Sequence, residues 1–289
     1  MKKLFVQILV ITFLFGGCSE TSKQENTLQT FFRYTENSEI LISAHRGGKG
    51  YAGYPENCLE TLKYIKKHIP NTLFEIDVAK SKDSVLLLMH DNSLERTTTG
   101  FGRVDENNWQ TISQLKLKDD FGAITDFKIP LFKDVLDWAK KENAILTVDI
   151  KRSVDPEIVL RFIEENNALH QSVIITYSIK AAQKLYKLNP EVVLSVSIRN
   201  MEEFDRAANS GIPWENMVAF TGTMESDPSL YAKIHEKGVM CMLGTLGNLD
   251  KKAATNGDQL YSEWAQLGID VFATDRPLEV QKALSIHQK

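Results

Sequence analysis

The sequence predicts an α/β protein whose parallel strands close into an eight-fold (β/α)8 barrel, with a small insertion between the third and fourth strands. Two observations predict this fold. Short apolar runs alternate with longer amphipathic runs from residue 40 onward, as in repeated strand–helix units. The alternation continues over about 240 residues, a length that is most economically closed into one barrel. One stretch breaks this alternation, and it predicts the insertion.

Nine segments have the length and composition of strands, one more than the barrel needs. The short segment 217–221 is the first candidate for the extra piece. The nine segments are 40–45, 72–78, 85–90, 145–151, 173–177, 192–197, 217–221, 239–244 and 271–274. The amphipathic segments between them predict helices over 59–69, 132–142, 156–166, 180–188, 202–209, 229–237 and 259–267. Asn57 is the predicted cap of the first helix, with Glu60 three residues on.

The insertion is predicted over residues 92 to about 130, within the long stretch between His90 and Ile145. This stretch is rich in Thr, Asp, Asn and Gly. A loop of that length inside a compact domain is usually functional, as a lid or a small inserted subdomain. We see no other boundary after the N-terminal region, so residues 39–289 are predicted to form one domain.

The composition is that of a globular protein, with 289 residues of which 43% are hydrophobic and 25% are charged. The formal net charge of −4 provides no basic surface for nucleic acid, so no nucleic-acid partner is expected. An anionic substrate would have to be attracted by a local patch or a bound cation. Cys58 and Cys241 lie at the start of a helix and within an apolar run, and we predict that both are core thiols.

The N-terminus has the pattern of an export signal. Met1-Lys2-Lys3 is positively charged, the apolar run 4–15 is too short to span a bilayer comfortably, and small residues precede Cys18. A signal that ends on a cysteine resembles that of a bacterial lipoprotein, whose lipidated cysteine becomes the first mature residue. We therefore predict a signal peptide over 1–17, a lipid anchor at Cys18 and a polar tether over 18–38. The protein would be exported and anchored to a bacterial membrane, on its periplasmic or cell-surface face. An ordinary signal peptide and an N-terminal anchor helix are the alternatives.

Charged residues interrupt two of the predicted strands, always on one face. Residues two apart in a strand point the same way, so Glu75 and Asp77 share a face, as do Asp149 and Lys151. The alternate positions are apolar and are expected to pack on the outer helices. The charged face therefore looks into the barrel, near the C-terminal ends of the strands, where barrel enzymes place their active sites.

His45 and His90 end two further predicted strands. Three carboxylates that converge from two strands form a good cage for a hard divalent cation, Ca²⁺ or Mg²⁺. A lysine beside such a cation needs an anion between them, and phosphate is the natural one. Two histidines nearby can divide the work of general acid and general base. Taken singly, these features could be a solvated edge strand, an interior ion pair or a structural histidine. Their joint occurrence on four successive strands favours an active site.

Six short motifs occur in order: His45-Arg46-Gly47, Pro55-Glu56-Asn57, Glu75-Ile76-Asp77, His90-Asp91 followed by Arg96-Thr97-Thr98, Asp149-Ile150-Lys151, and Thr274-Asp275-Arg276-Pro277. In this order and spacing they resemble the glycerophosphodiester phosphodiesterase family, a branch of the phosphatidylinositol-phospholipase-C-like superfamily. The resemblance covers residues 40 to about 280. It implies a TIM-type barrel that hydrolyses small-molecule glycerophosphodiesters to glycerol 3-phosphate and an alcohol with the help of a divalent metal.

The resemblance also implies a role for each matched residue. The acid/base pair would be His45 and His90, the phosphate-binding cations Arg46 and Lys151, the metal ligands Glu75, Asp77 and Asp149, and a residue close to the site Glu56. Asp149 falls on a position that is normally Glu, and Tyr177 stands where Phe is common. Which histidine is the acid, which metal is native and what oligomeric state the protein adopts are left open.

Two alternative functions are compatible with the same residues. A phospholipase of the superfamily that acts on intact phosphatidylinositol or sphingolipid would need an exposed apolar rim, which Phe101, Trp109 and Phe121 could supply. A lipoprotein that captures a phosphorylated ligand without turnover would lack a histidine or a metal ligand, and none is missing here.

Overall fold

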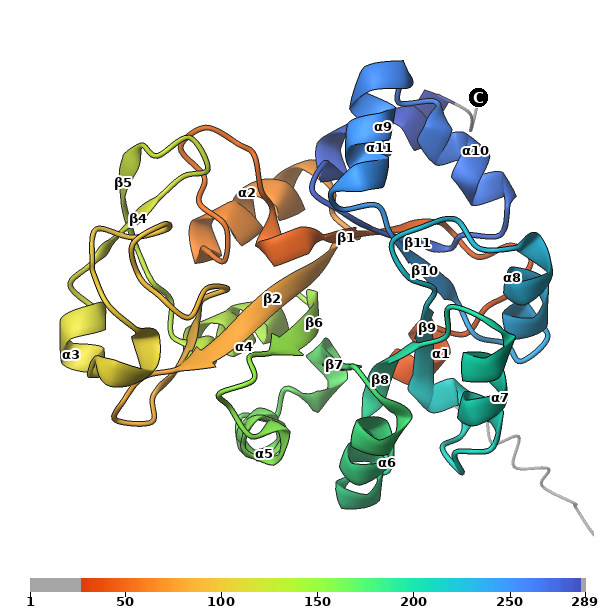
Figure 1. Ribbon diagram of the computed structural model, residues 1–289, viewed down its shortest axis with the longest axis horizontal. Helices are drawn as coiled ribbons and strands as arrows, with labels where there is room; N and C mark the ends of the chain where they lie inside the picture. Colours follow the sequence, from red (N-terminus) through yellow and green to blue (C-terminus); the bar gives the residue numbers. More distant parts are fainter. Residues whose placement is uncertain (1–26, 287–289) are drawn as a thin grey trace, which may run out of the picture.

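The computed structural model describes residues 27–286, in which eight parallel strands close into a barrel (Figure 1). β1 pairs with both β2 and β11, which closes the sheet. The predicted eight-fold α/β barrel is confirmed. In their order around the barrel, the strands are β1 (Leu41–Ala44), β2 (Leu73–Lys80), β6 (Ile145–Ile150), β7 (Ser172–Thr176), β8 (Val193–Ser197), β9 (Met217–Phe220), β10 (Cys241–Gly244) and β11 (Val271–Thr274).

Helices surround the barrel because each carries an apolar stripe at helical spacing. In α4 (Phe132–Lys141), for example, Phe132, Val135 and Leu136 are fully buried. The other long helices are α2 (Leu59–His68), α5 (Pro156–Glu165), α6 (Ile179–Leu188), α7 (Met201–Ala208), α8 (Pro228–His235), α9 (Asn248–Asn256), α10 (Leu260–Gln266) and α11 (Pro277–Ile286). Short 3-10 turns are η1 (His45–Gly47), η2 (Val104–Glu106), η3 (Leu169–Gln171) and η4 (Trp214–Asn216).

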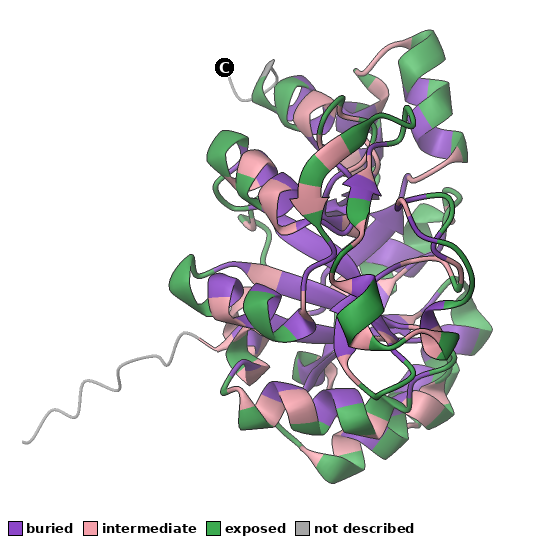
Figure 2. Cartoon of the chain, turned by 90° about the vertical axis from the view of Figure 1, so that its left-hand side faces the viewer, coloured by how far each residue is buried: buried purple, intermediate pink, exposed green. Residues whose placement is uncertain are grey.

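The core has two layers, one on each side of the strands. Phe74, Ile76 and Val78 of β2 point outward into a large apolar layer beneath the helices, as the alternation predicts. Figure 2 shows this arrangement, with buried strands at the centre and helices that are buried mainly on their inner side. A second apolar cluster fills the N-terminal end of the barrel interior and includes Leu41, Leu73, Val173, Val193, Met242 and Val271. The C-terminal end is left for polar side chains.

The structure corrects the prediction of which strand lies outside the barrel. Segment 217–221, the suspected extra piece, contains β9, a full barrel strand between β8 and β10. The extra strand is β3 (Leu86–Leu88), which pairs antiparallel with the end of β2. Because β2 runs on to Lys80 beyond the barrel, the chain can turn there and fold back beside it. The insertion therefore lies between the second and third barrel strands, not the third and fourth.

The insertion is a small subdomain beside the barrel, at the left of Figure 1. It contains α3 (Trp109–Ile112) and a two-stranded antiparallel sheet of β4 (Lys116–Lys118) and β5 (Ile124–Lys128). Its own apolar cluster joins it to β3 and includes Leu87, Met89, Leu94, Val104, Ile112 and Leu117. Its Asp119 and Asp120 accept backbone hydrogen bonds from Gly53 and Gly50 at 2.8 and 2.5 Å. The insertion thus fixes the loop that follows β1.

The predicted tether is wrong from residue 27 onward, because this segment packs against the base of the barrel. It begins with the short helix α1 (Leu28–Phe31), and Leu28 and Phe32 are buried in the basal cluster. The backbone NH of Tyr34 donates to the carbonyl of Gly238 at 2.9 Å. The apolar spacing of Leu28, Phe31 and Phe32 is that of one helical face, too short a pattern to recognise among polar neighbours.

The predicted signal peptide, Cys18 and the tether over 18–26 lie outside the described residues. Within residues 27–286, no helix is long and apolar enough to cross a membrane. The two cysteines of the barrel, Cys58 and Cys241, are both free and buried, which confirms that they are core thiols.

Replacing Phe32 with Ala should lower the free energy of unfolding by about 3–5 kcal/mol, because it empties a buried position at the barrel base. Phe101→Ala is the matched control, since Phe101 is 81% exposed and should change stability by less than about 0.5 kcal/mol. Denaturant unfolding of both variants measures the difference. A small effect at both positions would show that the segment over 27–38 does not belong to the folded domain.

Candidate active site

The turn that follows β1 has an unusual backbone that aims its side chains at the barrel mouth. Arg46 lies in the left-handed region, with φ 54° and ψ 33°, which is uncommon for a residue with a side chain. Its backbone NH donates to Oε2 of Glu75 at 2.7 Å. At Gly47, with φ 73°, a Cβ atom would lie 2.4 Å from Cδ1 of Leu62, so this position needs glycine. The strained turn thus places the backbone NH of Arg46 on the carboxylate of Glu75 inside the barrel.

Three carboxylates converge at the mouth from two neighbouring strands. Asp77 of β2 and Asp149 of β6 are directly opposite in the parallel register, and Glu75 lies one position deeper on the same face. One oxygen of each lies within 4.8 Å of the others. All three are buried, with exposed fractions of 9% or less. Three carboxylate oxygens suit a hard divalent cation such as Ca²⁺ or Mg²⁺, so these residues could hold a metal.

Lys151 partly neutralises this cluster. Its Nζ lies 2.7 Å from Oδ1 of Asp77 and 3.0 Å from Oδ2 of Asp149. Burial raises the pKa of Asp77, but the charge of Lys151 outweighs it and holds that pKa below its usual value. Burial, and then the charge of Asp77, raise the pKa of Glu75 well above its usual value. The cluster therefore carries one carboxyl group that resists ionisation unless a further cation compensates it.

Asn57 holds Asp77 rather than capping a helix, which corrects the predicted cap. Its amide nitrogen donates to Oδ2 of Asp77 at 2.7 Å, and its amide oxygen accepts from the Asp77 backbone NH at 2.9 Å. The cap position is the next residue, Cys58, and α2 begins at Leu59, while Asn57 has a left-handed backbone with φ 52°. The side chain that could have capped the helix instead fixes the orientation of a carboxylate in the cluster.

Both predicted histidines are oriented by a carboxylate on Nδ1. His45 Nδ1 lies 2.6 Å from Oδ1 of Asp275, and His90 Nδ1 lies 2.7 Å from Oδ1 of Asp91. A carboxylate accepts, so each ring donates from Nδ1 and keeps Nε2 for the site. The Nε2 of His45 lies 3.9 Å from Oε2 of Glu75. The hydrogen bond from Arg96 holds the pKa of Asp91 far below its usual range, so this partner stays ionised.

β3 explains how His90 reaches the mouth. The antiparallel hairpin returns the chain past the end of β2, where the backbone NH of Met89 donates to the carbonyl of Asp77 at 2.9 Å. His90 is the next residue, and its Nε2 lies 2.8 Å from Nη2 of Arg46. Because arginine can only donate, the Nε2 of His90 accepts here. β3 lies outside the barrel, and the chain that leaves it places His90 at the barrel mouth.

Glu56 joins two arginines at the edge of the site. It is 3% exposed and accepts from Nη1 of Arg46 at 3.0 and 3.1 Å and from both terminal nitrogens of Arg96 at 3.0 and 2.7 Å. Burial raises the pKa of Glu56, but the two arginines outweigh it and lower the pKa below its usual value. The buried Nε of Arg46 has no hydrogen-bond partner within residues 27–286. Arg46 therefore keeps donor capacity that an anion could use.

Tyr177 also belongs to the site. It follows β7, and its hydroxyl donates to Oδ1 of Asp149 at 2.8 Å. The residue as a whole is 74% exposed, yet its hydroxyl contacts a carboxylate of the cluster. Desolvation there, and then the charge of Asp149, raise the pKa of Tyr177 well above its usual value, so the hydroxyl stays a donor.

The structure brings every predicted site residue of the barrel to one mouth: His45, Arg46, Glu56, Glu75, Asp77, His90, Asp149 and Lys151. Sequence reasoning gave no orienting role to the residues that hold them in place, which are Asn57, Asp91, Arg96, Tyr177 and Asp275, and it assigned Asn57 to a helix cap instead. Four of these carried a signal, because Asn57, Asp91, Arg96 and Asp275 all lie within the six ordered motifs.

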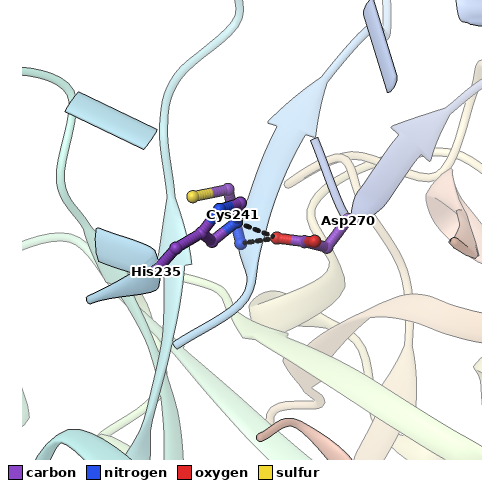
Figure 3. A group of neighbouring side chains, drawn as sticks. All are labelled: His235, Cys241 and Asp270. Carbon is purple, nitrogen blue, oxygen red and sulfur yellow. Dashed lines mark hydrogen bonds and ion pairs between the residues drawn. The ribbon is translucent and has the colours of Figure 1, made fainter. Parts of the chain in front are cut away.

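A second group of possible metal ligands lies at the opposite end of the barrel (Figure 3). Oδ2 of Asp270 accepts from the backbone NH of Cys241 at 2.6 Å and contacts Nε2 of His235 at 2.8 Å, while the sulfur points away from the carboxylate. Tyr34 stacks on His235 with ring centroids 3.5 Å apart. These contacts join β10, β11 and the segment over 27–38, so we assign the group a structural role.

Comparison with known proteins places the chain in a family. The model of the glycerophosphoryl diester phosphodiesterase family matches residues 45–278, from His45 to the first turn of α11. The chain belongs to this family. A glycerophosphoryl diester phosphodiesterase from Parabacteroides distasonis has a crystal structure with 33% identity and a TM-score of 0.85, over 90% of this chain and 91% of that one.

Other family members are more distant. Human glycerophosphodiester phosphodiesterase 1 is 27% identical over 169 residues, or 55% of this chain and 49% of the human protein. A glycerophosphodiester phosphodiesterase of Bacillus subtilis is 25% identical over 171 residues, or 53% of this chain and 57% of its own length. Each match covers less than two thirds of the relative. An Oleispira antarctica phosphodiesterase, solved with the product sn-glycerol-3-phosphate, shares the fold at 18% identity and a TM-score of 0.67.

Replacing Glu75 with Gln should stabilise the metal-free protein at pH 8. The pKa of Glu75 is raised in the folded state, so stability is lost as the pH rises above the ordinary carboxyl pKa, and a neutral Gln avoids this loss. Melting temperatures in chelator should agree near pH 4.5 and separate as the pH rises, with the variant higher. A variant that is less stable than the wild type at pH 8 would contradict the assigned repulsion.

Proposed function

We propose that this family member hydrolyses glycerophosphodiesters to glycerol 3-phosphate and an alcohol in a metal-dependent reaction, with His45 and His90 as general acid and general base. One observation carries the proposal. Two histidines, each oriented through Nδ1 by a carboxylate, lie beside the same carboxylate cluster and the same arginine. That arrangement matches the requirements of phosphodiester hydrolysis, which needs a base, an acid and positive charge at one phosphorus atom.

Glu75, Asp77 and Asp149 would hold a divalent cation, Ca²⁺ or Mg²⁺. When bound, such a cation supplies positive charge that stabilises the phosphate oxygens as negative charge develops on them. Arg46 and Lys151 would bind further phosphate oxygens. Lys151 contacts Asp77 and Asp149 within 3.0 Å, so it is held beside the metal ligands, where a phosphate could bridge it to the cation.

The histidines would move two protons. One Nε2 takes the proton of the attacking oxygen, which belongs to water or to the neighbouring hydroxyl of the glycerol. A new P–O bond forms, the P–O bond to the alcohol breaks, and the second histidine donates a proton to the leaving oxygen. When a glycerol hydroxyl attacks first, water opens the cyclic phosphate with the two roles reversed. Asp91 and Asp275 keep each ring in the orientation and tautomer that this transfer needs.

The substrate follows from family membership. The human, Bacillus subtilis and Parabacteroides distasonis relatives are glycerophosphodiester phosphodiesterases, and the Oleispira antarctica phosphodiesterase was solved with the product sn-glycerol-3-phosphate. A phospholipase that acts on intact lipid is the second candidate, because Phe101 and Phe121 of the expected rim are more than 60% exposed, as is Ile124. Trp109, the third residue of the expected rim, is instead partly buried against the apolar cluster of the insertion. Parallel assays of glycerophosphocholine and of phosphatidylcholine vesicles separate the two functions.

Replacing either His45 or His90 with Ala should lower kcat by at least about 100-fold, the usual scale for an acid/base group. Turnover of glycerophosphocholine measures the effect. His170→Ala is the matched control, because His170 lies in η3, before a strand and away from the mouth, and should leave kcat unchanged. A wild-type rate in either site variant would contradict the acid/base assignment.

We further propose that the protein is exported and anchored to a bacterial membrane by a lipid on Cys18, with no nucleic-acid partner. The pattern of residues 1–18 supports it. The first described residues lie at the barrel base, at the opposite end of the barrel from the carboxylate cluster.

Cys18→Ala should move the protein from the membrane fraction to the soluble fraction, because the lipid can no longer be attached. Cell fractionation and detection of the protein in each fraction measure this. Cys58→Ala, at a buried thiol of the barrel, is the control and should stay with the membrane. If the Cys18 variant also stays there, Cys18 is not the anchor.

A further inference from the structure

Each carboxylate of the cluster accepts one hydrogen bond from an uncharged donor, which is a backbone NH, a side-chain amide or a hydroxyl. Glu75 receives the backbone NH of Arg46 at 2.7 Å, and Asp77 receives the amide of Asn57 at 2.7 Å. Asp149 receives the hydroxyl of Tyr177 at 2.8 Å. The first two donors are fixed in the fold, one as backbone and the other on a buried side chain. The third is at the end of the side chain of Tyr177, a residue that is 74% exposed.

Asp149 depends on this third donor for its orientation. Its Oδ2 lies 3.0 Å from Nζ of Lys151, and its Oδ1 takes the Tyr177 hydroxyl. Without the hydroxyl, the carboxylate could turn about its Cβ–Cγ bond and offer both oxygens to the lysine, because that torsion is broad. The hydroxyl keeps Oδ1 on the Tyr177 side and Oδ2 towards Lys151 and Asp77. Asp77 lies directly opposite in the strand register.

We propose that Tyr177 is a positioning residue that orients Asp149 for cation binding, so that the strength of metal binding depends on a hydroxyl at the exposed rim of the site. This inference rests on the proposed metal site, and it adds a residue that the motif pattern did not assign. Groups that hydrogen-bond to metal ligands commonly change metal affinity by about 10- to 100-fold when they are removed. The same order of effect is expected here.

The exposed ring of Tyr177 could serve a different role, for which the hydroxyl is not needed. A tyrosine at the mouth could act only as an apolar wall against the leaving alcohol. That role needs the ring and tolerates loss of the oxygen. The proposed role needs the oxygen, and the ring serves only to carry it to Asp149. Phe and Leu at position 177 therefore separate the two roles, because Phe keeps the wall and Leu removes both.

The test is metal binding by the full-length chain, measured by calorimetric titration with Mg²⁺ and Ca²⁺ and without substrate. Tyr177→Phe should weaken binding by about 10-fold or more, and Tyr177→Leu should weaken it by the same factor. Tyr186→Phe, on α6 at a half-buried position packed in the outer core, is the matched control and should bind as the wild type does. Melting temperatures should match the wild type, because the ring of Tyr177 is mostly exposed.

A double-mutant cycle with Asp149→Glu tests whether the hydroxyl acts through Asp149. The extra methylene moves the carboxylate relative to the fixed ring, so the hydroxyl can no longer meet the same oxygen. Tyr177→Phe should then change the affinity by less than about twofold in the Asp149→Glu background. The inference is overturned if Tyr177→Phe binds metal as the wild type does, or if it causes the same loss in both backgrounds.

These results are distinguishable from failure of the proposed reaction. The inference is supported and the reaction is rejected if the wild type binds metal but does not cleave glycerophosphodiesters, and Tyr177→Phe weakens metal binding. The reaction is supported and the inference is rejected if the wild type cleaves substrate and Tyr177→Phe binds metal as tightly as the wild type. A wild-type chain that binds neither Mg²⁺ nor Ca²⁺ overturns the inference directly.

Discussion

One carboxylate oxygen each of Glu75, Asp77 and Asp149 lies within 4.8 Å of the others inside the barrel mouth. The repulsion between these groups must be offset by the residues around them. Burial strengthens that repulsion because little water screens it. Lys151 offsets part of it, and neutral donors from Arg46, Asn57 and Tyr177 hold the three groups in place. The arrangement costs stability, and it leaves three carboxylate oxygens that could hold a divalent cation.

The barrel and the charged side of its mouth were predictable because they depend on local periodicity. A strand with period two places Glu75 and Asp77 on one face, whatever the rest of the chain does. β3 and β9 were harder, since each is a short apolar run. Only the pairing partner shows that β3 folds back on β2, while β9 completes the barrel. Strand pairing depends on the tertiary structure, so the sequence of a single strand does not reveal its partner.

The orienting residues escaped prediction for a related reason. Asp275 and His45 are 230 positions apart, and the 2.6 Å contact between them exists only because β1 and β11 are neighbours in the closed barrel. Asn57 looked like a helix cap because asparagine favours caps, but its hydrogen bonds to Asp77 take precedence. The basal segment was read as a tether because three apolar residues make too short a pattern.

The measurement that tests the central claim most directly is ³¹P NMR of glycerophosphocholine incubated with the full-length protein, with Mg²⁺ or Ca²⁺ and with chelator in parallel. The account predicts that the diester resonance is replaced by that of glycerol 3-phosphate when metal is present, and that it persists in chelator. An unchanged diester in the presence of bound metal, or the same conversion in chelator, would contradict a metal-dependent glycerophosphodiester hydrolase.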